Sequence, residues 1–294
     1  MDKKLLEVIS ESVAKYHLSC YCEELDYKEL NHFLSTPLCN CIPDGYLADN
    51  EDWHPKIDWN VLEKMKLIRV ATRNTNVLHY ADLKSRDYKV KDVYNLLKVD
   101  YTKFDLFNFD IENLSHEDAY ALLCLGKQVF REKINISKYN FSFLEMRDII
   151  RSFDYEREII LDLNYKELKS YQVAEILSMT GEDNLDLFDL DILTTLDWLD
   201  LLNYQPGFIK YCDFEKFKKG DTYNLIQLVI LFIEPDLTYL MDDIDLKTIS
   251  ALGWEKLLIA RPDKFLDKCD FSKLNNSNWK EIISHNPDLA AYKL

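Results

Sequence analysis

The chain has 294 residues, more than one compact core usually holds, so two globular domains or one elongated array are the natural options. Its 36 basic and 52 acidic residues give a formal net charge of -16. Binding to nucleic acid or to an anionic membrane requires a basic patch, so this balance argues against both. An odd number of cysteines, seven, and no export signal indicate a reducing cytoplasm.

Residues 1–16 predict an amphipathic helix, because their apolar side chains recur at helical spacing on one side. Glu7 and Glu11 interrupt the apolar stretch that a secretory signal would need, so we assign this helix to the mature protein. We expect it to cap the chain, since the end of a repeat array needs a polar outer face. Residues 1–56 are therefore predicted to form capping helices and an irregular segment that contains cysteines.

Two pairs of cysteines fall in this N-terminal segment, Cys20 with Cys22 and Cys39 with Cys41. Four thiolates can hold zinc tetrahedrally, but ligand cysteines are usually separated by two or more residues so that both point inward. With one residue inside each pair, zinc is the weaker interpretation. Small buried side chains in a reduced protein are the favoured one. No other cofactor is expected.

A short phrase then repeats along the chain. In its clearest copies, which begin at Asp189, Asp245 and Asp270, a tryptophan follows nine residues after the aspartate, and a proline follows eight residues after the tryptophan. An apolar pair lies three and four residues after each tryptophan. Looser copies begin at Asp26, Asp58, Asp82, Asp110, Asn135, Asn164 and Asp213. The recurrent period of about 25 residues is the signature of a stacked repeat array.

The last copy shows what the phrase means physically. Trp279, Ile282 and Ile283 have the spacing that places three apolar groups on one face of a helix. The polar run 275–278 predicts the start of that helix, and Pro287 predicts its end and the start of a second, shorter one. A helix of about ten residues is marginal by itself in water, so the next repeat has to cover its apolar stripe.

We therefore predict an all-α protein, an elongated α-solenoid of about nine or ten short helical repeats. The array is expected to span residues 57–294, with the best-defined repeats at 164–294. One repeat carries extra residues, and we place this insertion at 218–224. The aspartates that open the repeats, Asp189, Asp213, Asp245 and Asp270, are expected to accept hydrogen bonds from backbone N–H groups nearby.

The acidic residues are concentrated in two stretches, 170–209 and 221–246, which contain no lysine, arginine or histidine. Unpaired like charges at this density cost stability by repulsion, so these acids either form a solvated face or contact a basic partner. Three aromatic residues beside these acids, Trp198, Tyr204 and Tyr239, are candidates to insert into a partner. The repeat position of Trp198, however, assigns that residue to the core. The candidate partner-binding residues are Glu182, Asp183, Asp186, Asp191, Asp197, Asp200, Asp236, Asp242 and Asp243.

No sequence motif predicts catalysis. The chain contains no Gly-x-Gly-x-x-Gly, no phosphate-binding Gly-x-x-x-x-Gly-Lys-Ser/Thr, no His-Glu-x-x-His and no Gly-x-Ser-x-Gly. The many carboxylate pairs on helices follow from the acidic composition and predict no acid–base role. We therefore do not expect an enzyme.

With its repeats aligned, the chain resembles the short α-helical tandem repeats of bacterial and viral interaction proteins. It is similar in logic to ankyrin, tetratricopeptide and HEAT arrays, but its period is shorter and it lacks the ankyrin Thr-Pro-Leu-His phrase. The resemblance covers residues 164–294 well and the remainder loosely. It implies a binding scaffold with a concave or flat recognition face and no chemistry of its own.

Two functions are compatible with these features. The first is a non-enzymatic protein–protein interaction scaffold whose acidic face binds a basic surface on a partner protein. The alternative is an acidic mimic of nucleic acid that inhibits a DNA- or RNA-binding enzyme, as some phage counter-defence proteins do. Nucleic acid should displace the mimic from its partner and salt should weaken it strongly, whereas a general scaffold is less sensitive to both. Neither function involves direct contact with nucleic acid or a membrane.

Overall fold

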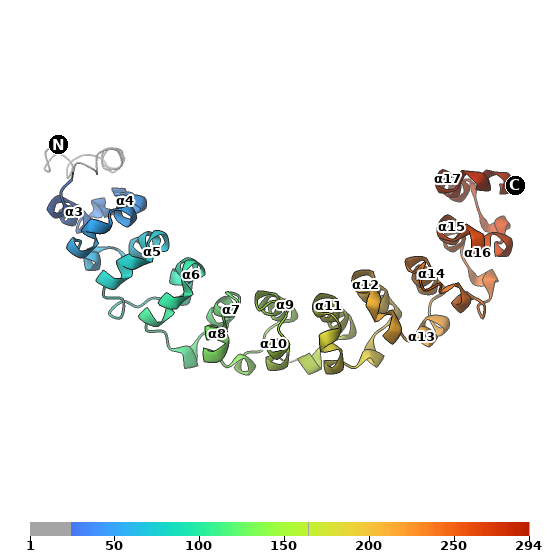
Figure 1. Ribbon diagram of the computed structural model, residues 1–294, viewed down its shortest axis with the longest axis horizontal. Coiled ribbons are helices and arrows are strands. Elements are labelled where there is room, and N and C mark those ends of the chain that lie inside the picture. The colour runs from blue at the N-terminus through green and yellow to red at the C-terminus, as the bar shows by residue number, and fades with distance from the viewer. Residues whose placement is uncertain (1–24, 164, 294) are drawn as a thin grey trace. The chain divides into compact units, whose positions relative to one another are not determined.

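The computed structural model describes residues 25–163 and 165–293, and every element of regular structure in these ranges is a helix (Figure 1). The prediction of an all-α protein is confirmed. The chain divides into two compact units, an N-terminal unit of residues 1–163 and a C-terminal unit of residues 164–294. The helix predicted at 1–16 lies outside the described residues.

In its described part, residues 25–163, the N-terminal unit consists of short α-helices interspersed with 3-10 helices. Its α-helices are α3 (Tyr27–Leu34), α4 (Asp44–Asp49), α5 (Lys64–Arg73), α6 (Val90–Val99), α7 (His116–Leu123), α8 (Gln128–Lys133), α9 (Phe143–Ser152) and α10 (Arg157–Asp162). Its 3-10 helices are η2 (Pro37–Cys41), η3 (Glu51–Lys56), η4 (Trp59–Val61), η5 (Thr75–Tyr80), η6 (Tyr101–Leu106), η7 (Ile111–Asn113) and η8 (Ile136–Lys138).

The C-terminal unit repeats this alternation. Its α-helices are α11 (Ser170–Thr180), α12 (Thr195–Tyr204), α13 (Phe214–Lys219), α14 (Thr222–Leu231), α15 (Ala251–Ala260), α16 (Pro262–Phe265) and α17 (Asn276–His285). Its 3-10 helices are η9 (Tyr165–Glu167), η10 (Glu182–Leu187), η11 (Leu190–Ile192), η12 (Pro206–Tyr211), η13 (Thr238–Met241), η14 (Leu246–Thr248), η15 (Leu266–Lys268), η16 (Phe271–Lys273) and η17 (Pro287–Tyr292). Helices α11, α12, α14, α15 and α17 pack in this order, each against the next.

Helix α17 forms as its sequence predicts. The side chain of Asn275 accepts hydrogen bonds from the backbone N–H groups of Ser277 at 2.8 Å and Asn278 at 3.1 Å, which caps the first turn. The helix ends at the residue before Asn286, and Pro287 opens the 3-10 helix η17. Trp279 is buried on the packed face.

The aspartates that open the repeats have the predicted structural role. Each accepts a hydrogen bond from the backbone N–H two residues later, an arrangement that stabilises a tight turn. The oxygen–nitrogen distances are 2.9 Å at Asp189, 3.1 Å at Asp213, 3.0 Å at Asp245 and 3.1 Å at Asp270. This prediction is confirmed, and it explains why these aspartates recur at fixed positions.

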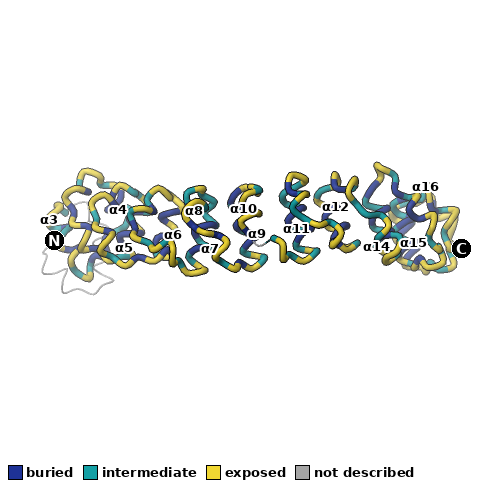
Figure 2. The backbone as a smooth tube through the Cα atoms, turned by 90° about the horizontal axis from the view of Figure 1, so that it is seen from below, coloured by how far each residue is buried: buried dark blue, intermediate teal, exposed yellow. Residues whose placement is uncertain are grey.

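The core of the C-terminal unit runs through consecutive helices. Trp198 and Trp254 are completely enclosed, and Trp279 packs into the same cluster of buried side chains. Figure 2 shows buried and exposed residues alternating along the helices. This alternation arises because the apolar side of each helix packs against a neighbouring helix, while its polar side faces solvent. The insertion predicted at 218–224 covers the end of α13, the turn after it and the start of α14. The three-residue 3-10 turn found after the other aspartates is replaced there by the six-residue helix α13.

In two repeats of the C-terminal unit, a lysine side chain joins the connector to the connector of the preceding repeat. Lys216 Nζ donates to the backbone oxygen of Asp191 at 2.6 Å and to that of Leu193 at 3.4 Å. Lys273 Nζ donates in the same way to Ile249 O at 2.8 Å. Both lysines lie three residues after the aspartate of their own repeat, so the contact itself is periodic.

A second set of contacts joins the ends of successive helices. In each contact, the residue just after one helix donates a hydrogen bond from its side chain to a backbone carbonyl at the end of the helix in the preceding repeat. Asn286 Nδ2 donates to Leu258 O at 3.1 Å and to Ile259 O at 3.0 Å. In the N-terminal unit, Asn74 Nδ2 donates to Ala48 O at 3.0 Å. Carbonyls at a helix end lack partners within their own helix, so these side chains satisfy them.

Candidate interaction surface

The main helices of the C-terminal unit, by which we mean α11, α12, α14, α15 and α17, pack side by side. Hydrogen bonds join the first turns, and the last turns, of neighbouring helices. At their first turns, Asn224 Nδ2 on α14 donates to Thr195 Oγ1 on α12 at 2.9 Å. At their last turns, Gln205 Nε2, just after α12, donates to Ser178 O on α11 at 3.0 Å. Because neighbouring helices start and end together, equivalent positions of successive helices form rows across them.

One of these rows is apolar and exposed. The second residue of helices α11, α12, α14 and α15 is a large hydrophobic side chain in every case. We call these residues the first-turn row: Tyr171 is 52 % exposed, Leu196 59 %, Tyr223 42 % and Leu252 47 %. A single exposed hydrophobic side chain is ordinary on a protein surface, but a contiguous set marks an interaction site.

The rest of the same helix face is more polar. Asp200 lies one turn beyond Leu196 on α12; it is exposed, and its carboxylate makes no hydrogen bond or ion pair within the described residues. Tyr204 ends the helix and is 75 % exposed. Gln227 on α14 and Lys256 on α15 occupy the position equivalent to Asp200 and are partly buried. We call this face, from the first-turn row to Tyr204, the exposed strip.

Asp197, expected among the surface acids, is instead buried and only 6 % exposed. Its Oδ2 accepts hydrogen bonds from the backbone N–H of Thr194 at 2.9 Å and from the Thr194 hydroxyl at 2.7 Å. The backbone N–H of Asp197 donates in return to Thr194 Oγ1 at 3.2 Å. This reciprocal pair is a capping box, so Asp197 stabilises the start of α12 and leaves the candidate surface.

Glu182, on η10, is exposed but paired within the chain. Its Oε2 lies 2.6 Å from Lys210 Nζ and accepts a hydrogen bond from the Tyr211 hydroxyl at 3.1 Å. Lys210 lies on η12, in the next repeat. The hydrogen bond from Lys210 is the largest influence on the pKa of Glu182; desolvation opposes it and the hydrogen bond from Tyr211 adds to it, and the net effect lowers the pKa. The negative charge that the stretch 170–209 presents is therefore partly compensated by a lysine just beyond it.

The acids of the second stretch are compensated in the same way. Asp242 Oδ1 lies 3.3 Å from Lys268 Nζ, and Asp243 Oδ2 lies 3.3 Å from Lys218 Nζ. All four side chains are at least partly exposed, so each pair contributes little to stability. The pairs do, however, reduce the field that these two aspartates present to a partner.

Asp236 is the most strongly held carboxylate of this group. It accepts hydrogen bonds from Thr238 N at 3.0 Å and from Thr238 Oγ1 at 2.8 Å. Its Oδ2 lies 3.0 Å from Arg261 Nη2 and 3.1 Å from Lys264 Nζ. The hydrogen bonds from Thr238, followed by those from the two cations, lower the pKa of Asp236 far below its usual value.

The remaining predicted acids differ in their surroundings. Asp183 and Asp186 are exposed on η10 and take part in further polar interactions. Asp191 is exposed on η11, where its backbone oxygen is the acceptor for Lys216. Only Asp200 of the nine predicted residues belongs to the exposed strip. Of the three candidate aromatic residues, Trp198 is buried in the core, as its repeat position predicts, while Tyr204 and Tyr239 are exposed.

Sequence reasoning missed the first-turn row. Its signal was present, because each member stands two residues after a capping position, as Leu196 follows Thr194 and Leu252 follows Ser250. The row is recognisable only when the helix starts are known to a single residue.

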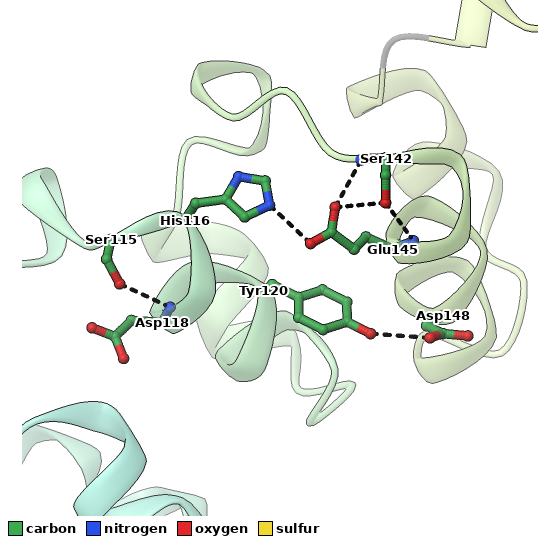
Figure 3. Close-up of polar contacts among 7 residues, drawn as sticks. All are labelled: Ser115, His116, Asp118, Tyr120, Ser142, Glu145 and Asp148. Atoms are coloured by element: carbon green, nitrogen blue, oxygen red, sulfur yellow. Dashed lines mark hydrogen bonds and ion pairs between the residues drawn. The ribbon is translucent and has the colours of Figure 1, made fainter.

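A polar cluster in the N-terminal unit joins the first turns of α7 and α9 (Figure 3). Glu145 Oε2 accepts from the N–H of Ser142 at 2.7 Å and from its hydroxyl at 2.8 Å, and His116 Nε2 lies 2.9 Å from Glu145 Oε1. Burial alone would raise the pKa of Glu145, but the hydrogen bonds from Ser142 and His116 outweigh it and lower the pKa. The backbone N–H of Glu145 donates in return to Ser142 Oγ at 3.4 Å, so Ser142 and Glu145 form a capping box that stabilises the start of α9.

The same pair of helices carries a second polar contact. The Tyr120 hydroxyl donates to Asp148 Oδ2 at 3.0 Å (Figure 3). Burial and this hydrogen bond raise the pKa of Tyr120 well above its usual value. A phenol held in its neutral form is a hydrogen-bond donor and not a base, so this contact fastens α7 to α9.

A groove of about 660 Å³ lies beside these contacts, between the first turns of α6 and α7. Lys89 and Lys91 line one part of it, and Asp110, Glu117 and Asp118 line another. Its lining contains no histidine or cysteine. The mixed charges do not single out a ligand.

The cysteines that the structure describes are packing residues. Cys39 and Cys41 are buried, and burial raises the pKa of the Cys39 thiol. Burial also raises the pKa of Cys212 and of Cys269 to about 12, which keeps both thiols protonated. Within the described ranges, no three His, Cys, Asp or Glu side chains are grouped to bind a metal ion. Cys20 and Cys22 lie outside these ranges, so zinc binding by the four cysteines, the weaker of the two interpretations, is not tested.

None of the helices in the described part of the chain combines the length and the apolar character needed to cross a bilayer. In comparisons with known proteins, the chain matches no protein-family model, no curated protein and no solved structure.

Proposed function

We propose that this chain is an α-solenoid of about nine or ten short helical repeats that works as a non-enzymatic protein–protein interaction scaffold in the cytoplasm. The observation that carries the proposal is the first-turn row, four exposed hydrophobic side chains at one position of four helices that pack in succession, α11, α12, α14 and α15. Keeping such side chains in water forgoes the free energy of burying them, about 25 cal/mol per Å² of apolar surface. A partner that covers the row recovers it.

The acidic character of the same unit supports a partner with a basic surface. Asp200 lies inside the exposed strip, and Asp183, Asp186 and Asp191 lie on the neighbouring connectors. Opposite charge accelerates encounter and excludes acidic competitors more than it strengthens the final complex. In this proposal the apolar row supplies affinity and the acids supply selectivity.

The alternative function, a mimic of nucleic acid, has less support. A mimic needs an array of uncompensated negative charges to replace the phosphates. Glu182, Asp242 and Asp243 are each paired with a lysine of the chain itself, and Asp197 is buried. We therefore favour the scaffold.

Affinity capture with the purified chain tests the function, read by mass spectrometry with and without excess DNA and RNA. We expect one protein to be retained in both conditions. We also expect the variant Leu196→Ser/Tyr223→Ser to release it, while Ile233→Ser, at an exposed hydrophobic residue outside the row, retains it. Release by the nucleic-acid competitor would favour the mimic, and equal capture by the double variant would overturn the role of the row.

Small-angle X-ray scattering tests the architecture separately. A compact globular chain of this length has a radius of gyration of about 19 Å. The solenoid predicts a value well above that and a maximum dimension to match. A compact value would overturn the solenoid.

A further inference from the structure

We propose that the exposed strip of α11, α12, α14 and α15 binds an amphipathic α-helix of a partner protein, with basic residues in the half of that helix that lies over α11 and α12. This inference rests on the interaction function proposed above and names the class of its partner.

The spacing of the row matches the period of a helix. Packed helices lie about 8–10 Å apart, so neighbouring members of the row are separated by about that distance. An α-helix presents the same face every seven residues, which corresponds to about 10.5 Å. Four apolar residues seven apart can therefore meet the row one by one. A β-strand presents one face at intervals of about 6.7 Å or 13 Å, and neither interval fits.

The width of the strip matches the diameter of a helix. Leu196 and Tyr204 are both exposed on α12 and lie eight residues apart, about 12 Å along the helix axis. An α-helix with its side chains is about 10–12 Å across. A helix laid across the strip is thus bordered by Leu196 on one side and Tyr204 on the other. A polyproline helix repeats at about 9.3 Å but is more slender, so it would leave part of this width uncovered.

The middle of the exposed strip, between the first-turn row and the level of Tyr204, is charged unevenly. We call this middle part the floor of the strip. Between Leu196 and Tyr204 lies Asp200, which is exposed and has no partner within the described chain. Glu175 holds the equivalent position on α11, Gln227 on α14 and Lys256 on α15. The floor therefore changes from acidic to basic from α11 to α15. A bound helix gains most when its lysines or arginines lie over α11 and α12.

Selection from a displayed library of random 28-residue peptides, with the full-length chain as target, tests the proposal. We expect the enriched peptides to carry apolar residues seven apart, with lysine or arginine beside them in one half, and to gain helical circular dichroism on binding. The variant Leu196→Ser/Tyr223→Ser should weaken them at least about tenfold, as loss of central contacts does. Ile233→Ser should leave their affinity unchanged.

A charge exchange tests the floor. Asp200→Lys should weaken a basic peptide at least about tenfold at low salt, and a peptide with glutamate in place of the facing lysine should recover binding to this variant. Asp263→Lys, an exposed acid on α16, is the control for net charge. Enriched peptides that bind without becoming helical, acidic peptides, or no enrichment at all would overturn the inference. The proposed function falls separately, if the double serine variant captures the same protein as the parent chain.

Discussion

The side chain of Gln205 is bound to the backbone of Ser178, with 3.0 Å between Nε2 and the carbonyl oxygen, although the two residues are 27 positions apart. Asn74, Arg261 and Asn286 make the equivalent contact with the end of the preceding helix. Gln205, Arg261 and Asn286 each stand immediately before a proline. The proline ends its own helix, and the side chain of the residue before the proline donates a hydrogen bond to the end of the preceding helix.

Replacement of Gln205 by alanine should lower the free energy of unfolding by about 1–2 kcal/mol, because it leaves a partly buried carbonyl without its donor. The control is Asn203→Ala on the same helix, where the amide is exposed and the change should stay within about 0.5 kcal/mol. Urea denaturation of both variants measures the difference. Equal loss from both variants would show that the contact contributes nothing.

Much of the local structure was predictable from the sequence. The spacing of Trp279 and Ile282, the polar residues around Asn275 and the proline at 287 gave the bounds of α17, because helix starts and stops depend on neighbouring residues. The turn-forming role of Asp189 was predictable for the same reason. These features depend on contacts within four residues, and the sequence displays such contacts directly.

Contacts between repeats were not predictable in the same way. Glu182 appeared uncompensated because the stretch 170–209 contains no basic residue, yet Lys210 in the next repeat lies 2.6 Å from it. A residue about 25–30 positions away in sequence is a spatial neighbour in this fold. Asp197 was misread for a different reason, since the pattern Thr194-x-x-Asp197 is a capping box that the sequence does display.

Gly126 should tolerate alanine far less well than Gly181 does. Both glycines have positive φ, +62° and +71°, so alanine strains either backbone by about 1–3 kcal/mol. A Cβ at Gly126 would also lie 1.9 Å from the backbone oxygen of Ser152, whereas none of the surroundings of Gly181 comes within 4 Å. Thermal unfolding of the two variants should show the larger loss for Gly126→Ala. The reverse order would contradict the described packing of the turn after α7 against α9.

Asp44 should be essential to the N-terminal unit because it compensates a buried lysine. Lys66 is 1 % exposed, its Nζ lies 2.9 Å from Asp44 Oδ1, and it also donates to the backbone oxygen of Ile42. Asp44→Ala leaves that ammonium group buried without a counter-charge, and we expect a loss of about 3–5 kcal/mol. Lys66→Met removes the charge and keeps the apolar stem, so it should cost less. Urea denaturation of the two variants distinguishes these costs, and a larger loss for Lys66→Met would refute the argument.

Asp236 should make stability depend on pH in the acidic range. Hydrogen bonds from Thr238, and then those from Lys264 and Arg261, hold its pKa far below the value of about 3.9 that an aspartate has in an unfolded chain. A depressed pKa means that the unfolded state binds the proton more readily, so folding is favoured while the group is ionised. The contribution of the ionised Asp236 carboxylate to the free energy of unfolding is complete above about pH 4. It is lost as the pH falls through the lower pKa that this carboxyl has in the folded state.

The variant Asp236→Asn should therefore be less stable than the parent chain at pH 7, and the difference between them should shrink as the pH falls from 4 towards 2. Urea midpoints at pH 7, 5, 4, 3 and 2 measure this, with Asp263→Asn on α16 as the exposed control. The control should follow the parent at every pH, because that carboxylate is exposed and has no contact to lose. High salt should weaken the part due to Arg261 and Lys264 but spare the hydrogen bonds from Thr238. A difference that stays constant with pH would show that the Asp236 carboxylate is not selectively ionised in the folded chain.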